Sequence, residues 1–332
     1  MFRPVFISAA LVITLTACGG GNPFREPTPG PIPEPGGDVT SGITGLPGTA
    51  TPGAGAPIRR REARASGTGN GYVSDVSYNA VADTFTVEGL AFDGGNVYRR
   101  DRSVNLGSEI SAYASDALAY DPTTGSPIPQ LTHRAVYGKA ASGSYFAIVR
   151  TGAYVDYGFG GFVYERAGGF SLPPADGAGK RGQGNFTGEY AGLRDFSGPG
   201  APGLEFTRGD MRMAIDFDDF NDGHGVNAVI SNRRVYDING ADITAVVAGA
   251  LPGSPAALPV ISFAIGPNVT DSSGEMAGRV VVDSTAAGNY YAVLGGAGAT
   301  EVVGIIALTP TPDGRTTGVT VRETGGFVLT RN

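Results

Sequence analysis

Hydrophobic and polar residues alternate with a period of two along most of the chain after residue 70. The clearest case is residues 211–217, where Met211, Met213, Ile215 and Phe217 share one face and the residues between them share the other. Successive side chains of a strand point to opposite faces of a sheet, so this pattern predicts half-buried β-strands. Similar alternation marks residues 72–78, 83–92, 134–150, with a turn at 141–143, and 154–166.

The strand pattern breaks once, in the segment FSLPPADGAGKRGQGN at residues 170–185, which is rich in proline, glycine and charge. About eight strand-like segments follow it, the number that closes a small barrel. We therefore predict an all-β protein in which a small N-terminal β-domain precedes a C-terminal eight-stranded antiparallel β-barrel. The predicted boundaries are 67–172 for the first domain, 173–184 for the linker and 185–332 for the barrel.

Two segments have helical spacing and are predicted as short connecting helices. In residues 240–251, Ile243, Val246, Val247 and Leu251 fall on one face, with Asn239 or Asp242 as the N-cap. Residues 108–120 are the second candidate. The segments GGFVYER at 160–166 and GGFVLTR at 325–331 also resemble each other, either as closing strands of two related β-domains or by coincidence.

The first residues predict an export signal followed by a lipid anchor. Arg3 precedes an apolar run that ends in the small residues Thr16 and Ala17, as in a secretory signal peptide at 1–17. Cys18, the only cysteine, follows directly. The sequence Leu-Thr-Ala-Cys at 15–18 resembles the lipobox of bacterial lipoproteins, which implies that Cys18 carries fatty acids such as palmitate and becomes the new N-terminus. Gly19 stands where an aspartate would imply retention at the inner membrane, so the resemblance implies the outer membrane.

Residues 18–66 are predicted to form a disordered tether. Residues 19–57 contain 11 glycines and 9 prolines, too little apolar surface to offset the entropy of ordering the chain. The basic segment IRRREAR at 58–64 is expected to be the solvated end of this tether, with a patch for anionic lipid or polysaccharide as the alternative.

Composition excludes several kinds of protein. The net charge is −7, which argues against a nucleic-acid partner. A single cysteine excludes intramolecular disulfides, so packing alone must supply the core. Tryptophan is absent, but 14 tyrosines and 16 phenylalanines supply large apolar groups.

Candidate chemistry is sparse, and we predict no cofactor, no metal site and no catalytic residue. His133 and His224 have no partner at zinc-ligand spacing, and no nucleophile elbow or phosphate loop is present. A Ser-His-Asp triad assembled only in space is the remaining enzymatic alternative. The four aspartates of DFDDFNDGHG fail the calcium-loop pattern, because Val229 stands where the twelfth-position glutamate is required. We expect a solvated hairpin mouth at these aspartates, Asp216, Asp218, Asp219 and Asp222.

The C-terminal third resembles the closing hairpin of the barrel in the transferrin-binding protein B family. The resemblance rests on LGGAGATEVVGIIALT at 294–309 and ETGGFVLTR at 323–331, with Gly296, Ala299, Glu301 and Gly304 in the places of that family's Gly-x-x-Ala-x-Glu-x-x-Gly segment. GNFTGEYAGLRDF at 184–196 resembles its first barrel strand. The resemblance covers 185–332 and implies a handle-like domain before the barrel. The four motif residues are expected to be structural, with the glycines at strand bends and Glu301 turned outward or capping a turn.

Members of that family are surface lipoproteins that hold a host protein or an iron-bearing ligand through loops at one end. Here the loops are not matched and one handle and one barrel replace two such lobes, so transferrin is not implied. The sequence is interpreted as an outer-membrane lipoprotein that binds a protein or iron-bearing ligand without catalysis. The alternatives are a lipocalin-like barrel that carries a small apolar molecule and a cell-envelope hydrolase. The face of the outer membrane and the ligand-binding residues are left open.

Overall fold

The computed structural model describes residues 42–65, 67–90, 93, 96–115, 118–152, 156–218 and 225–332. The predicted signal peptide, Cys18 and the first part of the predicted tether lie outside these residues, as do His224, Asp219 and Asp222. Residues Val39–Asn332 group as one unit by their contacts. Among the described residues, no helix is long and apolar enough to cross a membrane.

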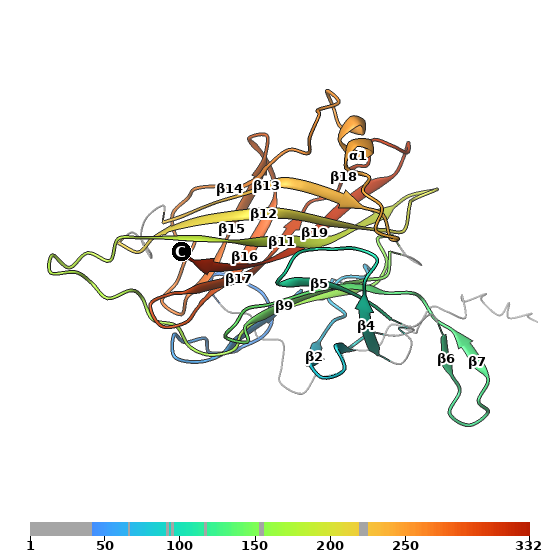
Figure 1. The fold of residues 1–332 in the computed structure, drawn as a ribbon, viewed down its shortest axis with the longest axis horizontal. Helices are drawn as coiled ribbons and strands as arrows, with labels where there is room; N and C mark the ends of the chain where they lie inside the picture. The colour runs from blue at the N-terminus through green and yellow to red at the C-terminus, as the bar shows by residue number, and fades with distance from the viewer. Residues whose placement is uncertain are drawn as a thin grey trace, which may run out of the picture. The chain divides into compact units, whose positions relative to one another are not determined.

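The C-terminal half is a closed antiparallel barrel (Figure 1). Strand β11 pairs with β12 on one side and with β19 on the other, and the β11–β19 ladder from Phe186↔Arg331 to Ser197↔Thr320 closes the ring. Eight strands form that ring within the described part of the chain, which confirms the predicted fold class. The barrel strands are β11 (Gln183–Ser197), β12 (Leu204–Asp216), β13 (Val226–Tyr236), β14 (Ile261–Phe263), β15 (Glu275–Val282), β16 (Thr285–Gly295), β17 (Glu301–Leu308) and β19 (Thr320–Arg331), and the two-residue β18 (Thr311–Pro312) pairs with β19 outside it.

The barrel interior is filled by side chains. The residues predicted to face inward at 211–217 are all buried. Met211, Met213 and Ile215 lie on β12 and Phe217 directly follows it, and none of the four is more than 3% exposed. Phe263 stacks on Tyr290 with ring centroids 3.7 Å apart. The same buried cluster includes Phe186, Tyr190, Met211, Met213, Ile215, Phe217, Ile230, Met276, Leu294, Val302, Ile306, Phe327 and Leu329. A packed interior stabilises the ring and leaves the lipocalin-like alternative without support.

The N-terminal half is one eight-stranded antiparallel sheet in the order β1-β10-β9-β8-β5-β4-β3-β2. Its two edge strands are tied together, because the Arg59 guanidinium on β1 donates to Asp75 on β2 and, at 3.4 Å, to the Ser74 carbonyl. We call this curled sheet the rolled sheet. Its strands are β1 (Ile58–Arg61), β2 (Asp75–Asn79), β3 (Thr84–Glu88), β4 (Val97–Asp101), β5 (Ile110–Ser115), β8 (Arg134–Lys139), β9 (Tyr145–Arg150) and β10 (Gly160–Arg166), and β6 (Leu118–Tyr120) with β7 (Pro127–Pro129) forms a separate hairpin.

The rolled sheet is covered on both faces. On β9, Ala147 and Val149 face the inside of the roll, whereas Phe146 and Ile148 pack in a cluster with barrel residues. That shared cluster includes Leu193 of β11 and Val303 of β17, among other side chains on the outer wall of the barrel. The two sheets therefore share a hydrophobic core, although residues 171–182, which join them, carry no strand.

The predicted tether is shorter than expected at its C-terminal end. Leu46 and Ile58 are buried, and the Arg61 amide donates to the Pro47 carbonyl at 3.1 Å. Gly48, with φ +146°, lets the two backbones approach, because a Cβ there would lie 2.1 Å from the Arg59 carbonyl oxygen. Proline and glycine disfavour a regular core element, but they do not prevent a segment from pairing with a strand already anchored in a sheet.

The basic segment at 58–64 was predicted to be the solvated end of the tether, and this prediction is wrong. Arg60 is fully buried, and its guanidinium forms two hydrogen bonds with the Glu275 carboxylate, at 2.6 and 2.8 Å. The strand alternates buried and half-buried residues, which places Ile58 and Arg60 against the barrel side. An arginine is buried here because a barrel carboxylate neutralises it, which a charge pattern in the sequence does not reveal.

One predicted helix is present and one is wrong. Helix α1 (Thr244–Ala250) lies within 240–251, and the Asp242 carboxylate accepts the Thr244 amide at 2.9 Å, although the N-cap residue itself is Ile243. Val247 and Ala248 are its buried residues, whereas Val246, predicted to be on the inner face, is 62% exposed. Residues 108–120 contain strands β5 and β6 instead. Strand β5 pairs with β4 and β8, and β6 pairs with β7, and this pairing overrides the local helical spacing.

Candidate functional site

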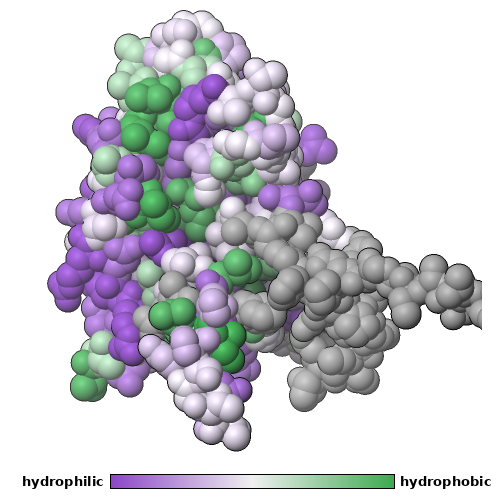
Figure 2. Space-filling view, turned by 90° about the vertical axis from the view of Figure 1, so that its right-hand side faces the viewer, coloured by the Kyte–Doolittle hydropathy of each residue, from purple (hydrophilic) through white to green (hydrophobic). Residues whose placement is uncertain are grey.

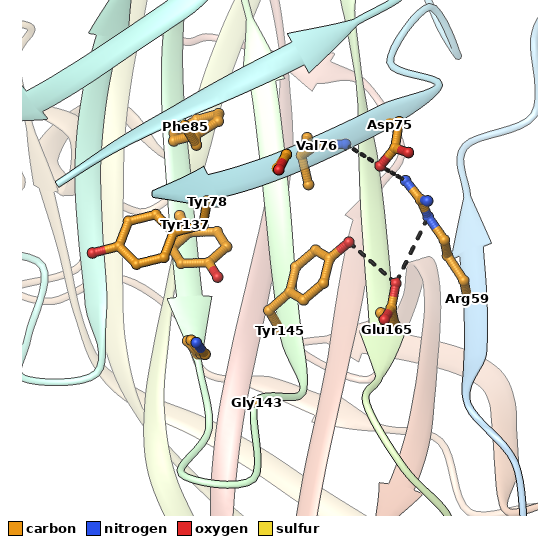
Figure 3. A pocket seen from close by; sticks show the side chains of 11 residues that line it. Arg59, Asp75, Val76, Tyr78, Phe85, Tyr137, Gly143, Tyr145 and Glu165 are labelled. Carbon is orange, nitrogen blue, oxygen red and sulfur yellow. Dashed lines mark hydrogen bonds and ion pairs between the residues drawn. The ribbon is translucent and has the colours of Figure 1, made fainter. Parts of the chain in front are cut away.

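A recess opens at one end of the rolled sheet, between the curled strand β2 and the hairpin of β8 and β9 (Figure 3). Its volume is about 310 Å³, at the lower end of the range for ligand pockets. We call it the tyrosine recess. It is lined by Arg59, Asp75, Val76, Ser77, Tyr78, Phe85, Tyr137, Lys139, Gly143, Tyr145 and Glu165.

The floor of the recess is one row of side chains that crosses four neighbouring strands. Lys139 of β8 lies opposite Tyr145 of β9, Tyr145 opposite Glu165 of β10, and Glu165 opposite Arg59 of β1. Directly opposed residues of antiparallel strands point to the same face and are close enough to interact. The register therefore places a cation at each end of the row, with a phenol and a carboxylate between them.

The charges at the Arg59 end neutralise one another. The Arg59 guanidinium bonds to Asp75 and lies 3.9 Å from the Glu165 carboxylate, which also accepts a hydrogen bond of 3.2 Å from the Tyr145 hydroxyl. Burial raises the pKa of the Glu165 carboxyl, and Arg59 and the Tyr145 hydroxyl oppose that effect. This end of the recess is a closed set of ion pairs and hydrogen bonds.

The Lys139 end carries an unneutralised positive charge. Its ammonium lies 5.8 Å from the centroid of the Tyr78 ring, a cation–π distance. The side chain is exposed, and it forms no ion pair with any of the residues that the structure describes.

Aromatic rings form the roof and the inner wall. Tyr78 of β2 stacks on Tyr137 of β8 with centroids 5.0 Å apart and planes 26° apart, and Tyr137 lies 5.7 Å from Tyr145. Burial raises the pKa of the Tyr137 and Tyr145 phenols well above the ordinary value, so both are neutral at physiological pH. Neutral phenols offer apolar faces and hydroxyl groups that donate.

A carboxylate behind the roof holds Tyr78 in place. Asp83, in the turn between β2 and β3, accepts hydrogen bonds from the Tyr78 hydroxyl at 3.1 Å and from the Tyr113 hydroxyl at 2.7 Å. The guanidinium of Arg100 donates to its other oxygen at 3.0 Å. These hydrogen bonds counteract desolvation and lower the pKa of Asp83. The Tyr78 ring is therefore held in position without a ligand.

The lining residues of the tyrosine recess are mainly aromatic and charged. They include no histidine and no cysteine, and Ser77 is the only lining residue with an aliphatic hydroxyl group. A nucleophile needs a base within hydrogen-bond reach, which this set does not offer to Ser77. Among the described residues, no group of three or more metal-ligating side chains could hold a metal ion.

Of the histidines and aspartates singled out in the sequence, His133, Asp216 and Asp218 are described, and none of the three lines the tyrosine recess. His133 is fully buried, its Nδ1 is 3.1 Å from the Leu131 carbonyl, and burial lowers the pKa of its imidazole. A buried imidazole without a hydrogen-bonded carboxylate does not favour a triad. Asp218 accepts the backbone amides of Arg181 and Gly182 at 2.8 and 3.2 Å, whereas Asp219, Asp222 and His224 lie outside the described residues.

Glu301 is a buried structural residue. It accepts hydrogen bonds from the Ser142 and Ser144 hydroxyls, the second at 2.6 Å, in the turn between β8 and β9. It is 7% exposed and therefore not turned outward. The expected capping role is present, but the capped turn belongs to the rolled sheet and not to the barrel.

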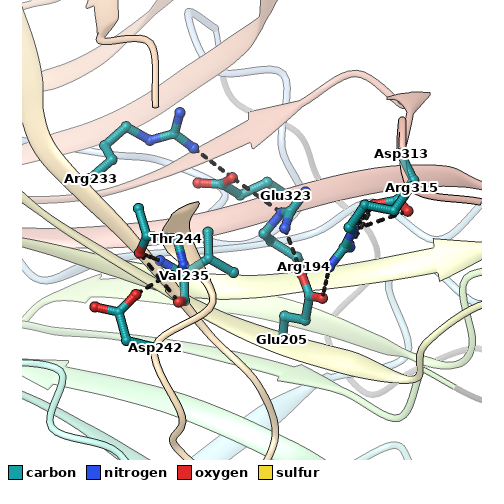
Figure 4. A network of polar contacts seen from close by, with 9 residues as sticks. All are labelled: Arg194, Glu205, Arg233, Val235, Asp242, Thr244, Asp313, Arg315 and Glu323. Atoms are coloured by element: carbon teal, nitrogen blue, oxygen red, sulfur yellow. Dashed lines mark hydrogen bonds and ion pairs between the residues drawn. The ribbon is translucent and has the colours of Figure 1, made fainter. Parts of the chain in front are cut away.

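A second polar cluster lies in the barrel, and its charges are paired with one another (Figure 4). Glu323 accepts a hydrogen bond of 2.7 Å from Arg233 and one of 2.8 Å from the Tyr190 hydroxyl. Glu205 is bound by Arg194 and by Arg315, at 2.5 and 2.6 Å. Since every charge here has an opposite charge beside it, this cluster stabilises the barrel and leaves no charge for a ligand.

On the face seen in Figure 2, hydrophobic residues lie in separate patches among hydrophilic ones. Among described residues the exposed large apolar side chains are Val81, Leu118, Tyr120, Ile128, Val246, Val260 and Ile265. Single exposed apolar residues are usual on soluble surfaces.

The sequence did not single out the tyrosine recess. The alternation of the sequence predicted some of the strands that carry the four floor residues. It did not predict that these residues lie side by side, because that depends on the register of the strand pairs. The one local signal is Lys139, because the protein has only two lysines, Lys139 and Lys180, among 24 basic residues.

Comparisons with known proteins give a structural likeness only. No protein-family model and no curated protein matches the sequence. Solved structures with a similar arrangement include two mutants of transferrin-binding protein B, a vaccine antigen from Haemophilus parasuis Hp5. The double mutant is 10% identical with a TM-score of 0.36, over 78% of this chain and 45% of that one. The single mutant is 9% identical with a TM-score of 0.32, over 77% of this chain and 65% of that one.

This chain therefore spans less than two thirds of either structure. Scores at this level carry no functional inference, so the function is argued from the chemistry of the tyrosine recess.

Proposed function

We propose that this protein is a lipid-anchored, non-catalytic binding protein of the bacterial outer membrane, and that its ligand or part of a partner protein enters the tyrosine recess. The observation that carries the proposal is the ordered row Lys139–Tyr145–Glu165–Arg59 beneath the stacked pair Tyr78 and Tyr137. Concave sites that combine aromatic walls with a few placed polar groups are typical of ligand binding.

Preorganisation supports binding at this place. Tyr78 is held by Asp83, and Glu165 is held by Arg59 and Tyr145, so a ligand would not have to order these side chains. Ordering rotamer-rich side chains at an interface costs about 0.5–1.5 kcal/mol each. The recess avoids most of that cost.

The anchor is a separate part of the proposal and rests on the sequence. The apolar run ending in Leu-Thr-Ala-Cys supports fatty acylation of Cys18, and Gly19 after it supports the outer membrane as the destination. Palmitate and related acyl groups on one cysteine would provide the several lipid tails that stable anchoring requires.

The alternatives receive less support. A lipocalin-like carrier needs room inside the barrel, which is filled by the aromatic and aliphatic cluster around Tyr290 and Phe263. An envelope hydrolase needs an accessible base; His133 is fully buried, and His224 lies outside the described residues. Since the described residues include no cluster of metal-ligating side chains, an iron-bearing ligand would have to hold its iron by groups of its own.

Affinity capture tests the proposal. Full-length protein, immobilised in mild detergent, would be exposed to envelope extracts, and bound proteins and small molecules would be identified by mass spectrometry. The Tyr78→Ala variant removes the roof of the recess, and Tyr120→Ala, at a tyrosine that is 65% exposed outside it, is the matched control. We expect a species retained by the wild type and by Tyr120→Ala but lost from a folded Tyr78→Ala variant. Identical sets on all three proteins would contradict the proposal.

A further inference from the structure

We infer that the tyrosine recess selects a ligand with an aromatic ring and a carboxylate group joined by a short flexible link. This inference rests on the proposed function and assigns the ligand class for the same site. Three features of the recess lead to it: its balance of charge, its aromatic walls and its size.

The balance of charge favours an anion. Arg59 already satisfies both acids of the recess, Asp75 by direct bonding and Glu165 at 3.9 Å. A cationic ligand would have to displace Arg59 from one of them. Lys139 offers its ammonium without competition from any described carboxylate, and it stands at the rim, where a charged end of the ligand can keep part of its hydration.

The walls favour a flat ring. The rings of Tyr78, Tyr137 and Tyr145 follow one another along the recess, with successive centroid separations of 5.0 and 5.7 Å (Figure 3). Aromatic pairs at such distances prefer offset-stacked or edge-to-face contacts, which stabilise beyond the area that they bury. A ring that enters beside Tyr145 gains these contacts, and the Phe85 ring also lines the recess.

The volume of the recess suits a single ring with a short acidic arm. A cavity of about 310 Å³ is close to the lower limit of about 300 Å³ for small-molecule sites. Two sources share this chemistry, namely a free aryl carboxylate and the C-terminal aromatic residue of a peptide or protein.

The sequence allows a direct readout at Lys139, because Lys180 is the only other lysine. Reductive methylation of lysines with an isotope-labelled reagent keeps their positive charge and gives each side chain its own NMR signal. The full-length protein would be titrated with hydrocinnamate, with hydrocinnamyl alcohol and with phenylpropylamine, which share the ring and differ in charge. N-acetyl-glycyl-phenylalanine and its C-terminal amide would test the peptide source.

We expect hydrocinnamate to move the Lys139 signal and leave the Lys180 signal unchanged. Because the Lys139 side chain is exposed, its ion pair with a carboxylate contributes about 0–1 kcal/mol, so the alcohol should bind up to about fivefold more weakly. In isothermal titration of the unmodified protein, Lys139→Met should lose a similar factor, whereas Lys139→Arg and the control Lys180→Met should retain binding. Tighter binding of the acetylated peptide acid than of its amide and of hydrocinnamate would identify the C-terminus of a polypeptide as the source.

Two results would overturn the ligand class. Equal binding of the alcohol or the amine would show that the recess binds rings without selecting an anion, and the proposed function would stand. No change of the Lys139 signal with any acid would also overturn it, and the capture experiment with Tyr78→Ala would then decide the proposed function by itself.

Discussion

Arg60 and Glu275, 215 positions apart in the sequence, form a two-pronged ion pair whose side chains are both fully buried. The pair joins β1, at the edge of the rolled sheet, to β15 of the barrel. Its geometry explains why a segment with the appearance of a basic tether belongs to the folded protein.

Glu275→Ala should destabilise the protein strongly, because it leaves the Arg60 guanidinium buried without a counter-charge. Breaking a buried pair in this way costs about 3–5 kcal/mol. Chemical denaturation of wild type and variant measures the loss. Arg234→Gln is the control, since the Arg234–Asp242 pair is 59% and 39% exposed at its side chains and such pairs contribute about 0–1 kcal/mol. A loss for Glu275→Ala no larger than for the control would contradict a buried pair.

Gly326→Ala should loosen the packing of the rolled sheet on the barrel. A Cβ at Gly326 would lie 2.2 Å from the Phe146 ring, whereas one at the neighbouring Gly325 would lie 2.3 Å from the Tyr190 ring inside the barrel. Overpacking of this kind costs about 1–3 kcal/mol, which a shift in melting temperature would report. Gly249→Ala in α1, with open space around it, should instead stabilise by about 0.5–1 kcal/mol. Equal shifts at the two positions would show that Gly326 is not in a tight contact.

The full-length protein should melt in a single transition because the two sheets share a core. An isolated 185–332 fragment should form its barrel but melt at a lower temperature and bind a hydrophobic dye, since Leu193, Val303 and Ile305 would lose their cover. Calorimetry and dye fluorescence test both statements. Val303→Thr with Ile305→Thr in the fragment should reduce dye binding while keeping strand propensity. A fragment as stable as the full-length protein would mean that the halves are independent.

Stability should fall at acid pH partly because of Glu323. Burial alone would raise the pKa of this carboxyl, but Arg233, Arg194 and the Tyr190 hydroxyl hold it below the ordinary value. A depressed folded-state pKa stabilises the protein above the unfolded value of about 4.3, and that contribution is lost as the pH falls through the folded-state value.

The pH dependence of unfolding in Glu323→Gln checks this expectation. The variant should be less stable at neutral pH and should lose less stability on acidification than the wild type. Glu88→Gln, at an exposed position, should leave the profile unchanged. The same slope below pH about 4.3 in Glu323→Gln and wild type would contradict the assignment.

Cys18→Ser should release the protein from membranes. The prediction follows from the position of the only cysteine directly after the apolar run. Metabolic labelling with a fatty-acid analogue and fractionation of cells measure it. A serine variant that still carries the label would show that the lipid, if present, is attached elsewhere.

Local pattern in the sequence determined the strands and their faces. Met211, Met213, Ile215 and Phe217 are buried as the alternation predicted, and the hairpin of β8 and β9 turns where glycine and serine predicted it. Strand geometry is set by neighbouring residues, and a period of two is sufficient to assign an inner and an outer face. The number of such segments after residue 185 was sufficient for a closed barrel.

Tertiary structure alone decided which strands meet, and with them the site. Lys139, Tyr145, Glu165 and Arg59 lie in one row only through the register of three strand pairs, and a shift of one residue in any pair would turn its side chains to the other face. Arg60 is buried because Glu275 neutralises it from the barrel. Within the segment of helical spacing at 108–120, residues 110–115 became strand β5 because β4 and β8 flank them. Strand pairing and charge neutralisation between residues far apart in the sequence are properties of the folded protein. They cannot be predicted from any short segment of the sequence.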